Sequence, residues 1–467
     1  MADRNKELAV NTVILGIGQL VPKFLAIILL PLLTAYLTKE EYGNYDLILS
    51  FASLLIPVVT LQIQQAVFRH LLASSDFEDK SKYVTSSLLY LLVSSVVFYP
   101  VVFIILLLLG IDCKSGLLIC LLFWGEAMYN LIGQIARGLG YNARYSAGVI
   151  VYSTANLICT AILLVIFGFG LSGVIISLTL GYVCADIFMI ISSGMLKYFS
   201  IRKFDKNALK ELLSFSVPIV PSSIALWIVN LSDRLIIIYF MGAAANGIYA
   251  VANKIPGLYS TVYGIFNLAW TETASRVKDD GNPSNYYAKL FDGLFNFLIG
   301  VMLLMIALTP LAFMILVKGD YGHAMYQVPI LYFGVFFNSF VNFYSGIYIA
   351  FKRTKQMGYS SVMGAVLNAV INITLISKIG LYAASVSTAL SFMVIALYRA
   401  YDLRNVVKID YSFKNIAAGI FCFVLSGVCL YLNSIPAMII CWVLAAAYNI
   451  LKNRTMMLAI IKKFIKK

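Results

Sequence analysis

The chain has 467 residues, of which 61% are hydrophobic and 12% are charged, with a formal net charge of +14 and a mean hydropathy of +0.89. A soluble domain carries about 25% charged residues, so this composition excludes an ordinary soluble enzyme and indicates a multi-pass membrane protein. The opening "MADRNKELAV" is polar and runs into an apolar segment too long for a signal-peptide core, so the first span is expected to remain in the protein.

Fourteen apolar stretches are long enough for a membrane-spanning helix, which needs about 20 residues. In chain order they are residues 11–37, 45–70, 83–109, 116–137, 145–168, 171–196, 214–241, 246–272, 290–317, 328–350, 359–377, 380–400, 415–432 and 435–451. Turn-forming and polar residues separate them. The sequence therefore predicts an all-α polytopic membrane protein with about 14 transmembrane helices.

The Lys and Arg residues are distributed unequally between the two membrane sides that this segmentation defines. One side receives 28 of the 35 and the other receives four, while Lys23, Arg234 and Lys254 remain inside spans. By the positive-inside rule both termini are cytoplasmic. The net charge then indicates affinity for anionic lipid head groups rather than for nucleic acid. Residues 452–467 are predicted to form a basic amphipathic helix at the cytoplasmic interface, with a solvated tail as the alternative.

A weak internal repeat relates the two halves of the chain. Residues 36–51 align with 240–255 at an offset of 204, which pairs Gly43 with Gly247. This offset carries span one onto span seven, as expected for two parallel six-helix lobes around a central cavity. The predicted domains are an N-lobe (1–196), a cytoplasmic linker (197–213), a C-lobe (214–400), two further helices (401–451) and the tail (452–467).

Two stretches resemble a known family. "LLPLLTAYLTKEEYGNYDLILSFASLL" and "SDRLIIIYFMGAAANGIYAVANKI" are similar to segments of Wzx-type polysaccharide-biosynthesis proteins of the multidrug/oligosaccharidyl-lipid/polysaccharide exporter superfamily. The resemblance implies a flippase in the bacterial inner membrane. Its substrate would be an undecaprenyl-diphosphate-linked oligosaccharide, the repeat unit of O-antigen lipopolysaccharide, capsule or exopolysaccharide. The resemblance also implies a cavity lined mainly by spans 1, 2, 7 and 8.

Four cations in these spans are the candidate ligands of the substrate diphosphate, because Lys and Arg bind phosphate oxygens well. Lys23 lies about 12 residues from either end of its span, about 18 Å, so its side chain must face protein or a wet cavity. The alternative for Lys23 is a structural pair with a buried acid. The alternative role for Arg69 is that of an anchor at the membrane interface. Arg234 and Lys254 lie close enough to an end of their spans that their side chains could instead reach the membrane surface.

Acids inside the spans are the candidate sites for H⁺ or Na⁺ as a coupling ion, since intramembrane ionisable groups mark ion pathways. Glu126 is the deepest, and its alternative role is that of counter-ion to Lys23. Asp186 and Asp233 are further candidates. No other cofactor and no metal site is predicted.

Polar and aromatic side chains in spans 1, 2, 7 and 8 are the candidate contacts for sugars. They are Gln19, Gln62, Gln65, Asn230, Tyr259, Tyr263 and Asn267. For the tyrosines the alternative is ordinary helix packing or an interfacial aromatic belt.

The sequence shows no catalytic motif and no Walker loop, and its short connections argue against a membrane-embedded polymerase or ligase. Two transporter alternatives remain. One is a flippase for lipid II, which is the peptidoglycan precursor. The other is a multidrug/cation antiporter, but Lys23 argues against it because its positive charge would repel cationic drugs. Membrane lipids and other polysaccharide-assembly proteins are the expected partners besides the substrate.

Overall fold

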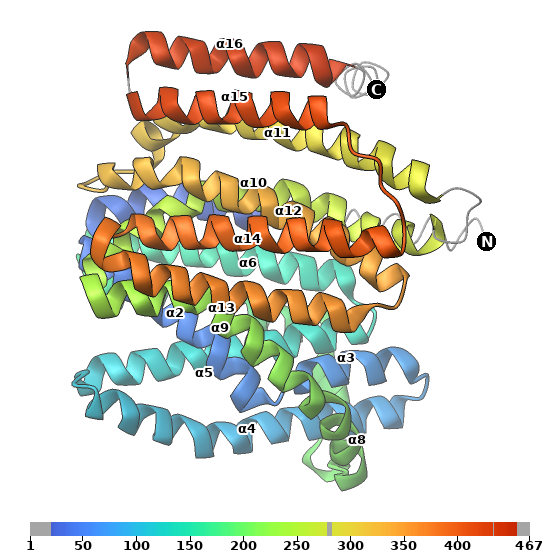
Figure 1. Cartoon of the computed structure of the whole chain (residues 1–467). Coiled ribbons are helices and arrows are strands. Elements are labelled where there is room, and N and C mark those ends of the chain that lie inside the picture. The colour runs from blue at the N-terminus through green and yellow to red at the C-terminus, as the bar shows by residue number, and fades with distance from the viewer. Residues whose placement is uncertain (1–19, 278–282, 433, 455–467) are drawn as a thin grey trace, which may run out of the picture. The chain divides into compact units, whose positions relative to one another are not determined.

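The computed structural model describes residues 20–277, 283–432 and 434–454, and the regular elements within these ranges are helices (Figure 1). The chain forms two compact units, Met1–Ser232 and Asp233–Lys467. The prediction of an all-α chain is confirmed for the described residues. The tail predicted at 452–467 lies almost entirely outside them.

Each of the fourteen predicted spans overlaps a helix. The first unit holds the helix Leu20–Tyr36, then α2 (Lys39–Thr60), α3 (Ile63–Ala73), α4 (Phe77–Leu108), α5 (Cys113–Gly138), α6 (Asn142–Ala161), α7 (Gly170–Ser193) and α8 (Lys206–Ser216). The helix α9 (Val220–Met241) continues into the second unit. There it is followed by α10 (Ala243–Val277), α11 (Pro283–Leu316), α12 (Val328–Ala350), α13 (Thr354–Ile379), α14 (Tyr382–Asp402), α15 (Phe413–Leu432) and α16 (Ile435–Lys452).

Eleven helical stretches among the described residues are long and apolar enough to cross a membrane. They correspond to α2, α4, α5, α6 with the π-helical turn Ile162–Ile166, α7, α11, α12 with its preceding turn, α13, α14, α15 and α16. The chain is therefore a multi-pass membrane protein.

Acidic residues in the breaks between the spans cap the following helices. Thr38 and Glu41 form a capping box at the start of α2, in which the Thr38 N–H donates to Glu41 at 2.9 Å. The Asp76 carboxylate accepts from backbone N–H groups at the start of α4, and Asp112 does the same for α5. A cap satisfies N–H groups that the helix leaves unpaired, which is why these helices begin where they do.

The second predicted span, residues 45–70, is split into α2 and α3. Leu61 and Gln62 have φ of 45° and 58°, the left-handed conformation that interrupts a helix. The Gln62 amide donates a 3.0 Å hydrogen bond to Ser223 of α9 and accepts one of 2.9 Å from Gln64. This tie holds the α2–α3 break in place.

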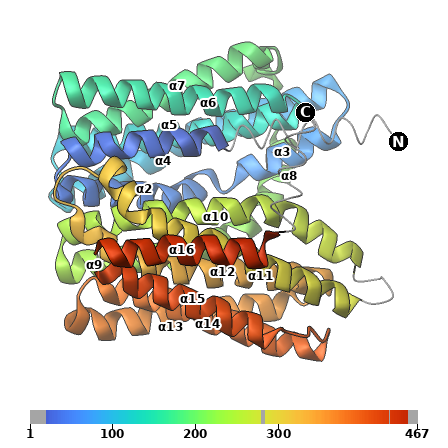
Figure 2. The same cartoon turned by 90° about the horizontal axis from the view of Figure 1, so that it is seen from above.

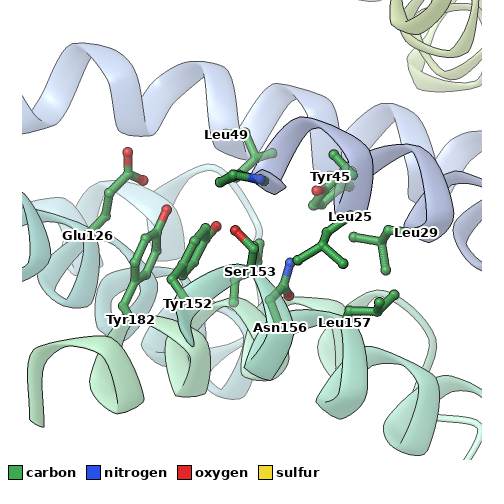
Figure 3. A pocket seen from close by; sticks show the side chains of 13 residues that line it. Leu25, Leu29, Tyr45, Leu49, Glu126, Tyr152, Ser153, Asn156, Leu157 and Tyr182 are labelled. Atoms are coloured by element: carbon green, nitrogen blue, oxygen red, sulfur yellow. The ribbon is translucent and has the colours of Figure 1, made fainter. Parts of the chain in front are cut away.

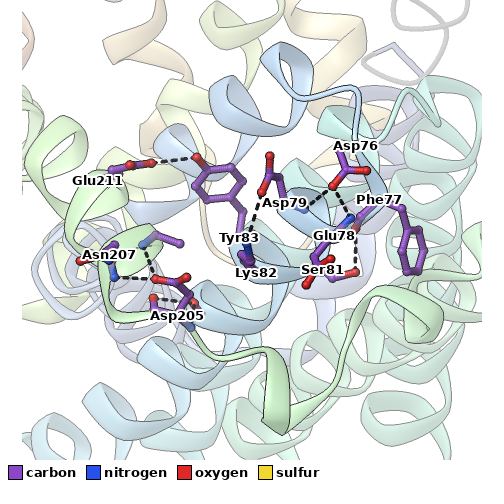
Figure 4. Close-up of polar contacts among 12 residues, drawn as sticks. Asp76, Phe77, Glu78, Asp79, Ser81, Lys82, Tyr83, Asp205, Asn207 and Glu211 are labelled. Carbon is purple, nitrogen blue, oxygen red and sulfur yellow. Dashed lines mark hydrogen bonds and ion pairs between the residues drawn. The ribbon is translucent and has the colours of Figure 1, made fainter.

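The amphipathic helix α8 begins within the predicted linker 197–213 and extends past it to Ser216, and it packs against α3 and α4. Polar contacts dock it: Tyr83 donates to Glu211 at 2.8 Å, as Figure 4 shows. Ser86 exchanges two 3.2 Å hydrogen bonds with the backbone of Asp205. The Asp205 carboxylate caps α8, and the N–H groups of Ala208 and Asn207 hold its pKa below the usual range. The segment therefore has a fixed place in the first unit.

Helix packing inside each unit follows a few close pairs. In the first unit α7 packs against α5 and α6, and Figure 2 shows α6 and α7 side by side. Gly181 allows this approach, because a Cβ there would lie 3.0 Å from the Tyr152 carbonyl oxygen. In the second unit α12 packs against α10 and α14, α13 against α14, and α11 against α15 and α16.

Candidate functional site

A cavity of about 320 Å³ lies within the first unit, between the helix Leu20–Tyr36 and α2, α5, α6 and α7 (Figure 3). Its lining is Pro22, Leu25, Ala26, Leu29, Tyr45, Leu49, Glu126, Tyr152, Ser153, Asn156, Leu157, Leu178 and Tyr182. One side is apolar and the other carries hydroxyl, amide and carboxyl groups. Such an amphipathic cavity suits a ligand with both apolar and hydrogen-bonding surfaces.

The polar wall is built on a stack of tyrosines. The Tyr152 and Tyr182 rings are parallel within 10°, with centroids 4.5 Å apart, and Tyr129 packs against both at 5.4 and 5.2 Å. In Figure 3 Glu126 lies beside Tyr182 at the cavity wall. The sequence-predicted acid is thus placed at a cavity wall, with hydroxyl groups around it.

Asp186 lies four residues after Tyr182 on α7, one helical turn further along. It is 9% exposed, and its Oδ1 finds no hydrogen-bond partner among the described residues. Buried carboxylate oxygens normally accept hydrogen bonds, so this atom is an acceptor open to a proton or a cation. Asp186 and Glu126, two of the predicted acids, both lie in the first unit.

A second polar centre surrounds Asp233 in the other unit. Asn372 of α13 donates to Oδ1 of Asp233 at 2.8 Å, while Thr388 of α14 and Tyr249 of α10 donate to Oδ2 at 2.6 and 3.2 Å. Asp233 is 7% exposed. Four helices therefore meet at one buried carboxylate. The three hydrogen bonds that it accepts compensate part of the free-energy cost of burying its charge.

Oxygen atoms dominate the Asp233 centre. Besides the carboxylate, it contains the hydroxyls of Tyr249 and Thr388 and the Oδ1 of Asn372, which accepts no hydrogen bond within the described part of the chain. Asn368, one turn before Asn372, donates to Thr388 at 3.2 Å and supports its orientation. Carboxylate, amide and hydroxyl oxygens are the ligands of hard cations such as Na⁺, and a carboxylate can equally hold a proton.

Lys23 and Arg69, the predicted cations of the first unit, are both exposed. Lys23 and Glu126 form no ion pair in the described structure, so the counter-ion alternative is not supported. The Arg69 guanidinium lies 4.5 Å from the centre of the Phe215 ring on α8, a contact that fits the alternative of an interfacial anchor.

Arg234 and Lys254 are the predicted cations of the second unit. Arg234 is half-buried and its charge acts on the neighbouring Asp233, whereas Lys254 is exposed on α10. The Arg234 side chain therefore contributes positive charge next to the buried carboxylate of the Asp233 centre.

The predicted sugar contacts divide between packing positions and exposed positions. Tyr259 is fully buried and donates to the Leu298 carbonyl at 3.4 Å, which favours the packing alternative. Gln62 is occupied at the α2–α3 break, and Gln65 is exposed. Gln19 and the Asn230 side chain lie outside the described residues.

Tyr263 and Asn267 form one local pair, with a 3.4 Å hydrogen bond between them. Tyr263 also lines a cavity of about 550 Å³ between α10, α11 and α16, together with Lys289 and Lys452. An aromatic ring and two ammonium groups around one space form a surface suited to sugar and phosphate groups.

Several site residues escaped the sequence analysis. Tyr152, Asn156 and Tyr182 line the first cavity, and Asn372 and Thr388 hold Asp233. A signal for them was present, because polar side chains recur at i, i+4 in apolar spans, as Tyr152 with Asn156 and Asn368 with Asn372 do.

Comparison with known proteins identifies the family. The family model described as "Polysaccharide biosynthesis protein" matches residues 8–276, more than half of the chain. No curated protein matches the chain. The resemblance noted in the sequence is confirmed by the family match.

Solved structures show the same fold at low sequence identity. "Lipid II flippase MurJ, inward closed conformation" matches with a TM-score of 0.72 and 14% identity, over 94% of this chain and 99% of that one. An inward-facing "multidrug resistance MATE family transporter of the MOP superfamily" matches with a TM-score of 0.65 and 14% identity, over 83% and 98%. The chain has the same fold as these two structures and belongs to the polysaccharide biosynthesis protein family.

Proposed function

We propose that this protein is a flippase that moves an undecaprenyl-diphosphate-linked oligosaccharide from the cytoplasmic to the outer leaflet of the bacterial inner membrane. Both termini would be cytoplasmic, and the two six-helix lobes would alternate between inward-open and outward-open states. The family match and the transporter fold support this proposal. O-antigen, capsule and exopolysaccharide repeat units are the candidate cargoes.

The observation that carries the proposal is the exposed side chain of Lys23 on a helix in the first unit. A lysine this far from both ends of its span is costly to keep in the membrane unless it faces water or an anion. Since Lys23 does not pair with Glu126, its ammonium is available to a diphosphate. Arg69, Arg234 and Lys254 complete the proposed set of phosphate-binding cations.

Ion coupling is proposed at the buried acids. The Asp233 centre offers a carboxylate with oxygen ligands from three further helices, so it can hold Na⁺ or a proton in one state of the transport cycle. Glu126, at the wall of the first cavity, and Asp186 beyond it are the proton-site candidates of the other unit. An ion bound at one of these acids would shift the equilibrium between the inward-open and outward-open states only if the two states bind that ion with different affinity.

The test is reconstitution of the purified protein with lipid-linked oligosaccharides, following exposure of the head group on the far side of the vesicle. Lys23→Ala is expected to reduce flipping at least tenfold, and Lys23→Arg to retain most of it, because Arg keeps the charge. Lys378→Gln, at the end of α13, is the matched control on an exposed lysine. Normal flipping by Lys23→Ala would remove the central claim.

A lipid II flippase is the second candidate. It is favoured by the likeness to MurJ over 94% of the chain, whereas the MATE structures cover 83–85%. The same vesicles loaded with lipid II decide between the two. Transport of lipid II but of no lipid-linked oligosaccharide would reassign the substrate, and transport of a cationic drug alone would favour the antiporter.

A further inference from the structure

An apolar groove separates two consecutive helices of the second unit. The helix α14 packs against α12 and α13, whereas α15, the next helix, packs against α11 and α16. Figure 1 shows the connection between them crossing from one pair of helices to the other. A cavity of about 370 Å³ lies here, with walls from α14 and α15 and a floor from α11 and α12.

Phenylalanines form the floor of the groove. Phe291 and Phe295 of α11 interlock with Phe336 and Phe340 of α12, with ring centroids 5.0 Å apart for Phe291–Phe340 and 5.6 Å for Phe295–Phe336. These rings are buried. These four rings form a continuous apolar surface. Tyr344 of α12 and Tyr411 also line the groove, and their hydroxyls are hydrogen-bonded to each other at 3.2 Å.

The rim of the groove is also apolar, and it is exposed. Leu397 and Tyr401 of α14 are 58% and 67% exposed, and Phe413 of α15 is 73% exposed. Along α14 the lining runs from Met393 to Tyr401, about 12 Å. That length matches most of one leaflet's hydrocarbon, about 15 Å. In a membrane, the occupant that fits such a groove is a hydrocarbon chain.

One end of the groove carries a positive charge. Arg404 lines the cavity and is exposed, with its guanidinium 5.7 Å from the centre of the Tyr401 ring. It makes no hydrogen bond or ion pair in the described part of the chain. The nearest acid in sequence, Asp402, is occupied by Tyr348 at 2.8 Å and Arg353 at 3.5 Å. The Arg404 charge is therefore available to an anion.

We propose that this groove binds an anionic phospholipid of the bilayer, with one acyl chain on the phenylalanine floor and the head-group phosphate at Arg404. The site is separate from both polar centres, and its occupant is not the transported substrate. Lys408 on the same connection and Lys414 at the start of α15 add positive charge, and Asp410 removes some, so the local charge favours an anionic head group. The lipid fills the space between α14 and α15 and links them.

The proposal is tested on the purified full chain in detergent, to which either phosphatidylglycerol or phosphatidylcholine is added. Bound lipid is measured by native mass spectrometry, and the thermal unfolding midpoint is measured in parallel. Phosphatidylglycerol should bind more tightly and raise the midpoint more. Arg404→Gln should weaken its binding about fivefold, as expected for one surface cation. Arg404→Lys should retain most of the effect, and Lys378→Gln should match the wild type.

A second variant tests the groove itself. Ala400→Phe places a ring in the path of the acyl chain, so it should reduce retention of phosphatidylglycerol while leaving Arg404 in place. Equal binding of the two lipids, or an Arg404→Gln protein that binds phosphatidylglycerol as well as the wild type, would overturn the proposal. Retention of lipid-linked oligosaccharide in place of phospholipid would overturn it as well. None of these results depends on the transported substrate, so the proposed flippase function is judged separately.

Discussion

Asn372 donates a 2.8 Å hydrogen bond to Asp233, although 139 residues separate them in the chain. The contact connects α13 with α9, and the bonds from Tyr249 and Thr388 bring α10 and α14 to the same carboxylate. A buried acid with so many partners costs less free energy than an isolated one, but it still favours a compensating cation or proton. The charge of the neighbouring Arg234 supplies part of this compensation, and a bound cation or proton would supply the rest.

Asp233→Asn is expected to abolish ion-dependent transport. The amide is isosteric with the carboxylate but carries no charge, so a cation loses its main ligand and no proton can bind. Flipping should be measured in vesicles with imposed Na⁺ or H⁺ gradients, and the stimulation by the gradient should fall at least tenfold. Asp410→Asn, at an exposed acid between α14 and α15, is the control. Undiminished stimulation in Asp233→Asn would place the coupling site elsewhere.

Glu126→Gln is expected to remove the pH dependence of transport if the first unit carries the proton. The substitution keeps the size of the side chain at the cavity wall, but it removes the exchangeable proton. Rates should be compared over a pH series on each side of the vesicle. Tyr182→Phe, which removes one hydroxyl and keeps the ring stack on Tyr152, should change the rate without flattening the profile.

The helices could be predicted from the sequence because apolar length and cap residues are local signals. The predicted span 328–350 coincides with α12, and the breaks at Thr38, Asp76 and Asp112 follow from side chains that cap the next helix. The interruption at Leu61 and Gln62 was not predicted. Neither residue is Gly or Pro, and the left-handed turn is held by a hydrogen bond to Ser223, far along the chain.

The candidate sites could be predicted only in part, because the contacts that build them join residues far apart in the chain. Glu126, Asp186 and Asp233 stand out because acids are rare inside apolar spans. Two of the three partners of Asp233, Asn372 and Thr388, come from helices more than 130 residues away and leave no spacing to recognise. Arg399 was counted with the cytoplasmic basic residues. The structure buries this α14 side chain, at 1% exposure, and the helices α12 and α13 supply the acceptors for its guanidinium.

Gly181→Ala is expected to destabilise the first unit by about 1–3 kcal/mol, the range typical of overpacking. Its Cβ would lie 3.0 Å from the Tyr152 carbonyl oxygen and 3.2 Å from the Tyr152 ring, so α6 and α7 must separate and the Tyr152–Tyr182 stack must shift. Gly257→Ala in α10 meets no atom within 4 Å and should be neutral or slightly stabilising. Thermal unfolding in detergent compares the two, and equal midpoints would contradict the close approach described for α6 and α7.

Arg399→Gln is expected to be the most destabilising of these substitutions. The Arg399 guanidinium donates to Ser360, to the carbonyl of Val341 and to the carbonyl of Met357, and further to Ser345 and Ser361, so it ties α12 and α13 to α14. A glutamine cannot reach all of these acceptors, and each buried acceptor left unpaired costs about 1–3 kcal/mol.

The result should therefore be a loss of about 2–4 kcal/mol in the free energy of unfolding. Arg399→Lys should recover little of it, because one ammonium cannot reproduce the planar fork. Denaturant unfolding measures this loss of stability, and the substitution Arg404→Gln at an exposed arginine serves as the control. If Arg399→Gln and Arg404→Gln unfold at the same denaturant concentration, the hydrogen bonds of Arg399 contribute nothing to the stability of the second unit. If Arg399→Gln unfolds earlier yet still flips substrate at the normal rate when folded, the role of Arg399 is confined to holding the three helices together.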